Sequence, residues 1–263
     1  MPYDPTTTNR PDPTPLSRRH LFQGAVAVGG ALAASHLGAE SAAAAAPAAK
    51  VRPDSVILLQ GDSITDAGRD KRRPGANDPR ALGAGYAGMI ATRLLGKFSG
   101  HALKCYNRGI SGNKVPDLDR RWQTDCIDLK PDVLSILIGV NDIWHKLNGR
   151  YPGTVKDYED GFAALLARTT KALPKTTIVI CEPFVLRCGA VGDKWFPEFD
   201  QRRAAAKRVA GSAGVIWVPF QSMFDDALSD KTPPNYWAGD GVHPTMAGHA
   251  LMAETWMDTV FGS

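Results

Sequence analysis

Five short apolar segments alternate with longer stretches of helical periodicity through most of this 263-residue chain. Each segment is apolar on consecutive positions, which is typical of strands buried on both faces of a parallel sheet. Strands that alternate with helices form a sheet covered by helices on both sides. We therefore predict an α/β fold, a three-layer α/β/α sandwich around a five-stranded parallel sheet. The expected strands are Ser55–Gln60, Ala102–Asn107, Val133–Ile138, Thr177–Cys181 and Val215–Val218.

The segments between the strands carry apolar residues at helical spacing, or end at Pro or Gly as helices do. Two irregular stretches interrupt this pattern. The first, Ala67–Gly85, is rich in Arg and Lys, and is either a functional loop that overhangs the site or a solvated surface loop. The second, Leu186–Pro197, follows the fourth strand. The expected helices are Tyr86–Phe98, Val115–Leu129, Tyr158–Leu173, Phe199–Ala210 and Thr245–Phe261.

The first fifty residues have the pattern of an export signal rather than of a folded domain. The pair Arg18-Arg19 precedes a mildly apolar stretch, and an alanine-rich tract with several A-x-A sites follows. The paired arginines resemble a twin-arginine signal, which predicts export of the folded protein to the periplasm or beyond. Glycines dilute the apolar stretch, which argues against a stable membrane span. We therefore assign residues 1–50 to a signal peptide with its linker and residues 51–263 to one domain. The alternative is a disordered tail.

Composition narrows the possible partners. The formal net charge of +4 is small and gives no argument for a nucleic-acid partner, which would need a clustered basic face. The four cysteines form no CxxC pair and no zinc-ligand spacing, and no HExxH sequence occurs, so we expect no metal and no cofactor. Cys181 and Cys188 are either bridged, if the protein is exported, or free and buried. The sequence does not indicate an oligomeric state.

Four short polar blocks lie in order along the chain, at the ends of expected strands or beside the last helix. In an open α/β sheet, ligands bind beyond the carboxyl ends of the strands. Ser63 lies there, and a serine acts as a nucleophile only if a base takes its proton. His243 is a candidate base, because Asp240 precedes it by three residues and can accept from its imidazole. The blocks are Gly61-Asp62-Ser63, Asn107–Gly112, Gly139–Asp142 and Asp240–Pro244.

These four blocks together resemble the SGNH hydrolases, also called GDSL esterases and lipases, over nearly all of the expected domain. The resemblance implies a flavodoxin-like sandwich, Ser63 as nucleophile, His243 as base and Asp240 as its partner. It also implies an oxyanion hole that consists of the Ser63 N–H, the Gly109 N–H and the side-chain amide of Asn141. A glycine lets the backbone approach a substrate closely, and Asn141 offers a donor without charge.

Three further polar residues lie near the blocks. We assign a structural role to two of them and leave two alternatives for the third. We expect Asp62 to brace its turn and His249 to be structural, whereas His145 is either a surface residue or lines the cleft. No G-x-S-x-G of an α/β-hydrolase and no G-x-G-x-x-G of a dinucleotide-binding domain occurs.

The sequence indicates the substrate less directly. Export, the lack of an apolar segment for an acyl tunnel, and similarity to the small branch with carbohydrate deacetylases favour deacetylation of a carbohydrate or polysaccharide. Trp237 and Trp195 suit stacking on a sugar, but equally an acyl pocket or the core. Arg69 is a further candidate contact. The alternatives are a lysophospholipase, lipase or thioesterase of the same family, or a non-catalytic carbohydrate-binding protein.

Overall fold

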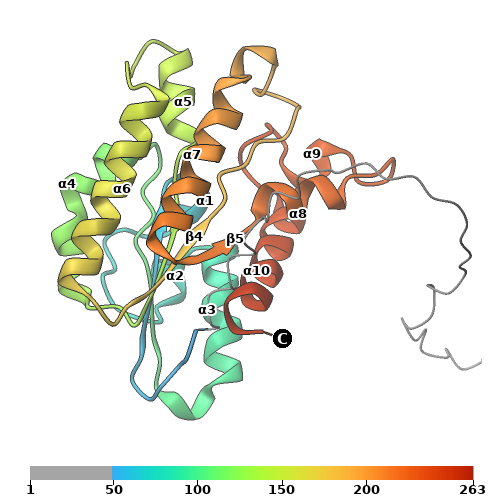
Figure 1. Ribbon diagram of the computed structural model, residues 1–263. Coiled ribbons are helices and arrows are strands. Elements are labelled where there is room, and N and C mark those ends of the chain that lie inside the picture. Colours follow the sequence, from blue (N-terminus) through green and yellow to red (C-terminus); the bar gives the residue numbers. More distant parts are fainter. Residues whose placement is uncertain (1–48, 263) are drawn as a thin grey trace, which may run out of the picture. The chain divides into compact units, whose positions relative to one another are not determined.

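A computed structural model describes residues 49–262 and shows five parallel strands in one sheet (Figure 1). The sheet order is β2-β1-β3-β4-β5, and all four pairings are parallel. The predicted α/β sandwich is therefore confirmed, with each strand within two residues of its expected position. The export signal predicted for residues 1–50 falls almost wholly outside the described residues and stays a prediction. The strands are β1 Val56–Gly61, β2 Lys104–Asn107, β3 Val133–Leu137, β4 Thr177–Cys181 and β5 Ile216–Val218.

The sheet is buried on both faces because its strands alternate between two apolar layers. On β1, Ile57 and Leu59 face one layer and Leu58 faces the other. Each layer also holds a buried tryptophan whose indole N–H has a partner. Trp256 Nε1 donates to Ser135 Oγ at 3.0 Å, and Trp122 Nε1 donates to Thr169 Oγ1 at 2.8 Å. A buried indole with a satisfied N–H adds apolar area without an unpaired donor.

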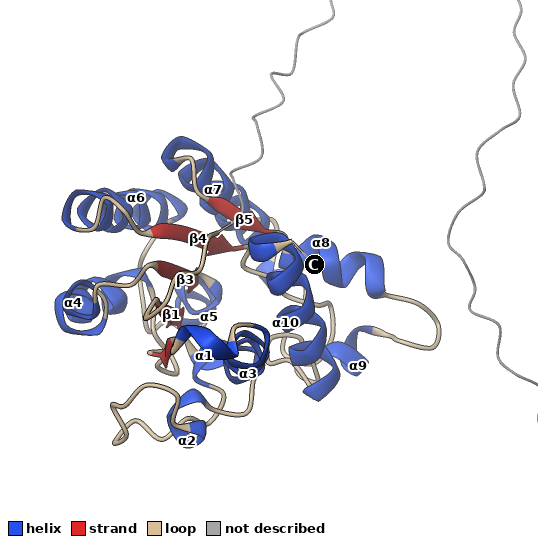
Figure 2. Cartoon of the chain, turned by 90° about the horizontal axis from the view of Figure 1, so that it is seen from below, coloured by secondary structure: helices blue, strands red, loops and turns tan. Residues whose placement is uncertain are grey.

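Helices cover the sheet on both sides (Figure 2). One side carries α3 Tyr86–Lys97, α8 Phe220–Ala227 and α10 Met246–Phe261, and the other carries α4 Val115–Asp125, α6 Val155–Ala172 and α7 Glu198–Ala213. Between residues 49 and 262, no helix is long and apolar enough to cross a membrane. The remaining helices are α1 Ser63–Asp66, α2 Pro79–Leu82, α5 Val140–Leu147 and α9 Pro234–Trp237, with 3₁₀ turns Ser99–His101, Ile127–Leu129 and Asp193–Trp195.

The sequence did not predict α5 and α8, nor the short helices α1, α2 and α9, and it extended one helix too far. Helix α2 lies within the Ala67–Gly85 stretch, which was expected to be irregular throughout. Helix α5 begins directly after β3, and its N-cap Gly139 makes no side-chain cap, so the usual start signal is missing. Similarly, Pro219 makes no side-chain cap for α8. The helix expected over Val115–Leu129 instead ends at Asp125, and a short 3₁₀ turn follows.

The four cysteines are free, so the open question about Cys181 and Cys188 is answered for this structure. Cys181 is buried on β4, where its Sγ lies 3.4 Å from Ser135 Oγ. Cys188 instead directs its Sγ to the Ala238 carbonyl at 3.2 Å. The two thiols therefore have separate neighbours.

A histidine on the last helix satisfies the start of α3. The N-cap residue of α3, Gly85, has no side chain, and His249 Nδ1 on α10 accepts from the Tyr86 N–H at 3.1 Å. The imidazole stacks on the Tyr86 ring, with centroids 6.4 Å apart and an angle of 10°. Burial, with a smaller effect from His243, lowers the pKa of His249 to about 4. The expected structural role of His249 is therefore confirmed, since it joins α10 to α3 as a neutral acceptor.

We expect this histidine to make stability fall in mild acid. The unfolded chain takes up its proton near the ordinary pKa of 6.5, whereas the folded chain does so only near 4. The stability that the neutral imidazole contributes is therefore fully present above pH 6.5. As the pH falls from there to about 4, the free energy of unfolding decreases by about 2–3 kcal/mol. Urea unfolding of the wild type and His249→Asn between pH 8 and 4 measures it. The wild type should lose that much relative to the variant, and a constant difference would contradict the expectation.

Candidate active site

The structure brings Ser63, His243 and Asp240 into one hydrogen-bonded chain. Ser63 is the first residue of α1, directly after β1, and the other two lie in the loop between α9 and α10. Ser63 Oγ is 2.9 Å from His243 Nε2, and His243 Nδ1 is 2.7 Å from Asp240 Oδ2. An ionised Asp240 accepts a hydrogen bond from Nδ1–H, which leaves Nε2 as the acceptor for the serine hydroxyl. The arrangement is that of a nucleophile, a base and an orienting carboxylate.

The Asp240 carboxylate also fixes the loop that carries the base. Its Oδ1 accepts the backbone N–H of Val242 at 2.9 Å and that of His243 at 2.7 Å. Burial alone would raise the pKa of Asp240, but the hydrogen bonds from His243 and Val242 hold the pKa below its ordinary value. The carboxylate therefore stays ionised beside the imidazole.

Asp62 positions the serine from the preceding residue. It is the N-cap of α1, and its Oδ1 accepts the Ile64 N–H at 3.0 Å, as a turn-bracing residue should. Its other oxygen is buried without a partner among the described residues. Burial raises the pKa of Asp62 to about 7, and burial likewise raises the pKa of Asp142 to about 7. Because its hydrogen bond goes to the Ile64 N–H, Asp62 acts on Ser63 through the backbone of α1.

The structure does not leave the Gly109 N–H free for a substrate. This N–H donates to Asn107 Oδ1 at 2.8 Å. A Cβ at Gly109 would collide with the backbone of Thr65 and Asp66, so the glycine allows α1 to pack against this turn. We therefore no longer assign Gly109 to the oxyanion hole.

Three other donors make no hydrogen bond to the described residues. They are the Ser63 N–H, the Gly112 N–H and one N–H of the Asn141 amide. Among residues 49–262, neither the Ser63 N–H nor the Gly112 N–H donates a hydrogen bond. Asn141 Nδ2 donates to the Asn113 carbonyl at 3.2 Å, which places it beside Gly112 and leaves its second N–H unused. Gly109 and Gly112 belong to the same sequence block, and their N–H groups differ because only that of Gly109 is bonded to Asn107 Oδ1.

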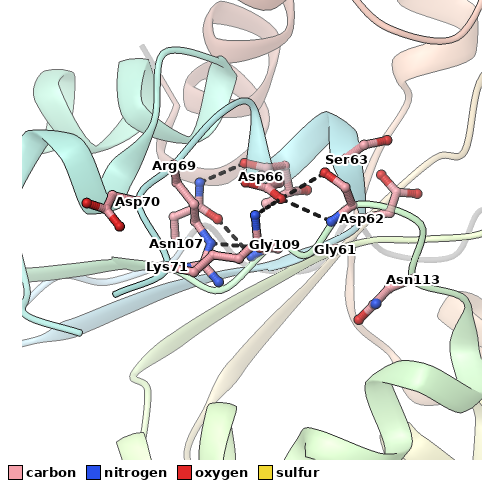
Figure 3. Close-up of polar contacts among 12 residues, drawn as sticks. Gly61, Asp62, Ser63, Asp66, Arg69, Asp70, Lys71, Asn107, Gly109 and Asn113 are labelled. Carbon is pink, nitrogen blue, oxygen red and sulfur yellow. Dashed lines mark hydrogen bonds and ion pairs between the residues drawn. The ribbon is translucent and has the colours of Figure 1, made fainter. Parts of the chain in front are cut away.

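Arg69 and Lys71 extend from the Ala67–Gly85 loop into a polar network under the site (Figure 3). Arg69 is 7% exposed, and its Nε donates to the Gly109 carbonyl at 2.7 Å. Lys71 Nζ lies 2.6 Å from Asp66 Oδ2, which also accepts from the Ser111 N–H at 3.0 Å and Ser111 Oγ at 2.8 Å. Burial would raise the pKa of Asp66, but the bonds from Lys71 and Ser111 hold the pKa below its ordinary value.

Arg69 and Lys71 hold together the segments that surround Ser63. Asp66 ends the one-turn helix that begins with Ser63, and Ser111 directly precedes Gly112. The network therefore links the serine to the segment with the open Gly112 N–H. Arg69, a predicted substrate contact, instead supports the Gly109 turn from within the protein. The Ala67–Gly85 loop is accordingly more than a solvated loop.

The aromatic ring beside the base is one that the sequence did not indicate. Trp195 is fully buried, and its Nε1 donates to the Ala190 carbonyl at 2.9 Å, so of the roles left open for it the structure supports packing in the core and not contact with substrate. Trp237 is half-buried, and its Nε1 donates to the Ala227 carbonyl at 3.2 Å. The ring next to His243 belongs to Trp144 on α5, with centroids 5.9 Å apart. It was missed because α5 itself was not predicted.

Neighbouring side chains complete the description of the site. His145, next to Trp144 on α5, is half-buried, and its Cε1 would lie 3.8 Å from a Cβ on Gly112. Of the two roles left open for His145, the structure therefore places it beside the site. Within residues 49–262, no group of three or more His, Cys, Asp or Glu side chains could hold a metal ion.

Comparison with known proteins gives a consistent assignment. Residues 59–251 match the family model described as the GDSL-like Lipase/Acylhydrolase family. The acetylxylan esterase of Geobacillus stearothermophilus is 34% identical over 211 residues, which cover 79% of this chain and 94% of that protein.

Solved structures agree with this family. A crystal structure described as that of a GDSL-like lipase from Parabacteroides merdae has a TM-score of 0.79 and 49% identity, and the match covers 81% of this chain and 99% of the other. The Geobacillus esterase structure has a TM-score of 0.71 and 32% identity, and the match covers 80% and 96% of the two chains. Two further structures of that esterase are catalytic mutants, in which alanine replaces a serine or an aspartate. The present chain therefore belongs to the GDSL-like lipase/acylhydrolase family and is a carboxylic ester hydrolase.

Proposed function

We propose that this protein is a serine esterase that removes acetyl groups from a carbohydrate or polysaccharide. The observation that carries the proposal is the chain of hydrogen bonds from Ser63 Oγ through His243 to Asp240, at 2.9 and 2.7 Å. The likeness to an acetylxylan esterase supports the choice of an acetylated sugar. The catalytic serine and aspartate of that relative support the roles of Ser63 and Asp240.

The proposed reaction has two halves. His243 Nε2 takes the Ser63 hydroxyl proton while Oγ attacks the acetyl carbonyl carbon. The tetrahedral intermediate collapses when the same nitrogen gives the proton to the sugar oxygen, which leaves acetyl-Ser63 and a free sugar hydroxyl. Water then attacks the acetyl carbon with His243 again as base. The bond to Ser63 Oγ breaks, His243 returns the proton to Oγ, and acetate leaves. Asp240 stabilises the imidazolium in both halves.

The oxyanion of each intermediate needs donors that are already in place. We assign this role to the Ser63 N–H, the Gly112 N–H and the unused N–H of Asn141 Nδ2. Asn113 and the Asp66 network support this choice, because they hold the Gly112 segment beside Asn141 and Ser63.

Asn141→Ala should therefore lower kcat by about 100- to 1,000-fold with a small change in KM, because the donor acts mainly on the transition state. Steady-state kinetics on an acetate ester measure both constants. Asn148→Ala is the matched control, since Asn148 is an exposed asparagine at the other end of α5. A loss that appeared only in KM would contradict the assignment of Asn141.

The substrate is tested with acetylated xylo-oligosaccharides and a p-nitrophenyl ester series from acetate to octanoate. We expect acetate release from the sugar, and a kcat/KM that falls steeply with acyl length. A maximum at octanoate with no acetate from any glycan would favour the lipase or lysophospholipase alternative. Preference for an acyl thioester would favour a thioesterase. Binding of glycan without turnover of any ester would favour the non-catalytic alternative.

A further inference from the structure

Helix α5 directs several side chains toward the site. Asn141 lies near its start, and Trp144 and His145 follow three and four residues later. Residues at these spacings lie on the same face of a helix. His145 lies beside Gly112, and Trp144 lies beside His243. The helix that supplies the Asn141 donor therefore also places an indole next to the base.

The indole of Trp144 is held in position from behind. Its ring centroid is 5.6 Å from that of Trp195, at an angle of 57°. Trp195 is itself fully buried, bonded through Nε1 to the Ala190 carbonyl and packed on Phe199. A ring that is fixed before binding loses little conformational entropy when a ligand packs on it.

The polar edge of Trp144 has no partner in the part of the chain that the structure describes. Buried indole N–H groups usually find an acceptor. Trp144 Nε1 donates no hydrogen bond to any described residue. It is also absent from the polar atoms that are buried without a partner, so solvent can reach it. The residue is partly exposed, so this N–H is available to a ligand. Four other tryptophans donate their indole N–H within the protein: Trp122, Trp195, Trp237 and Trp256.

The chemistry of the reaction determines which part of an ester lies beside Trp144. His243 Nε2 must reach the leaving oxygen in order to protonate it, so the alcohol half of the ester lies beside His243. The carbonyl oxygen lies among the donors of Ser63, Gly112 and Asn141. Trp144 flanks His243, with a centroid separation of 5.9 Å. Its indole is therefore on the side of the alcohol, which in the proposed function is the sugar.

We propose that Trp144 binds the sugar ring that carries the acetyl ester. The indole packs on the apolar C–H face of this pyranose, and Nε1–H, which points outward in the plane of the indole, donates to a hydroxyl of an adjoining sugar unit. An aromatic wall with one well-placed polar group is a common way to orient a small ligand. This inference rests on the proposed function, and it assigns the specificity for the alcohol to one residue.

The test compares two acetate esters that differ only in the alcohol. One is an acetylated xylo-oligosaccharide, and the other is 2,2,2-trifluoroethyl acetate, whose small alcohol cannot stack. A p-nitrophenyl ester is unsuitable because its aromatic leaving group can itself stack on the indole. Trp144→Leu should lower kcat/KM on the sugar about 10- to 100-fold, and change it less than about threefold on the trifluoroethyl ester.

Trp144→Phe is the second variant, because it keeps an aromatic face and is less disruptive to packing. It lacks the indole N–H, so we expect a loss of about three- to tenfold on the sugar alone. Free xylo-oligosaccharide should inhibit both variants less strongly than the wild type. Trp217→Leu is the matched control, since Trp217 is half-buried on β5 and packs in the other apolar layer from Trp144. Its effect should be the same on both esters.

Equal losses on both esters in Trp144→Leu and Trp144→Phe would overturn the proposal, because Trp144 would then only support His243. No loss on the sugar in either variant would overturn it as well. A wild type that hydrolyses trifluoroethyl acetate but releases acetate from no sugar would instead contradict the proposed function. The two failures are therefore distinguishable from the wild-type measurement alone.

Discussion

Ser63→Ala is expected to lower ester turnover at least about a thousandfold, because no other group in the proposed mechanism supplies the attacking oxygen. The fold should survive. Within residues 49–262, Ser63 Oγ makes one hydrogen bond, to His243 Nε2, and the cap that holds α1 comes from Asp62 instead. The loss should therefore appear in kcat, with the melting temperature within a few degrees of the wild type.

Acetate release and thermal unfolding measure the two halves of this expectation. A fluorophosphonate should label the wild type at Ser63, as peptide mass shows, and should leave Ser63→Ala unlabelled. Ser212→Ala is the control, since Ser212 is an exposed serine on α7. Turnover by Ser63→Ala near the wild-type rate would remove the basis of the proposed mechanism.

Asp240→Asn should lower kcat by about 1,000- to 10,000-fold while keeping the loop intact. The asparagine oxygen can still accept from the N–H groups of Val242 and His243. Its amide, however, would donate to His243 Nδ1 and force the imidazole proton onto Nε2. That nitrogen could then no longer accept the Ser63 proton.

The pair should also behave as one unit. His243→Ala removes the base, so Asp240 has nothing left to orient, and the double variant should be hardly slower than His243→Ala alone. Single-turnover kinetics on one acetate ester supply all four corners of the cycle. Losses that multiply would mean that Asp240 and His243 act independently, which the 2.7 Å contact between them opposes.

The strands and the polar blocks at their ends could be predicted because both depend on local sequence. A strand such as Val56–Gly61 needs only a short run of apolar residues that ends in Gly61-Asp62-Ser63. Parallel pairing then places the carboxyl ends together, which is why Ser63 and Asn141 could be placed at one edge from sequence alone. His243 could be paired with Asp240 because the two are close in the chain.

The errors concern residues whose role depends on a distant neighbour. Gly109 and Gly112 belong to one sequence block, and nothing in the sequence says which N–H is free. They differ because the Gly109 N–H donates to the Asn107 side chain. Arg69 has the sequence context of an exposed loop, yet it is buried against the Gly109 carbonyl. Trp144 contacts His243 only because the uncapped helix α5 follows β3. No local pattern contains these tertiary contacts.

The position of the base has a consequence for how activity appears during biosynthesis. Ser63 Oγ contacts a residue 180 positions later in the chain, and α10, which packs on α3 through His249, begins three residues after it. Most of the sheet can form while the nucleophile still lacks its base. A chain stopped before the α9–α10 loop would be inert toward esters. The onset of ester hydrolysis during refolding therefore reports the docking of the final helix, a late and long-range event.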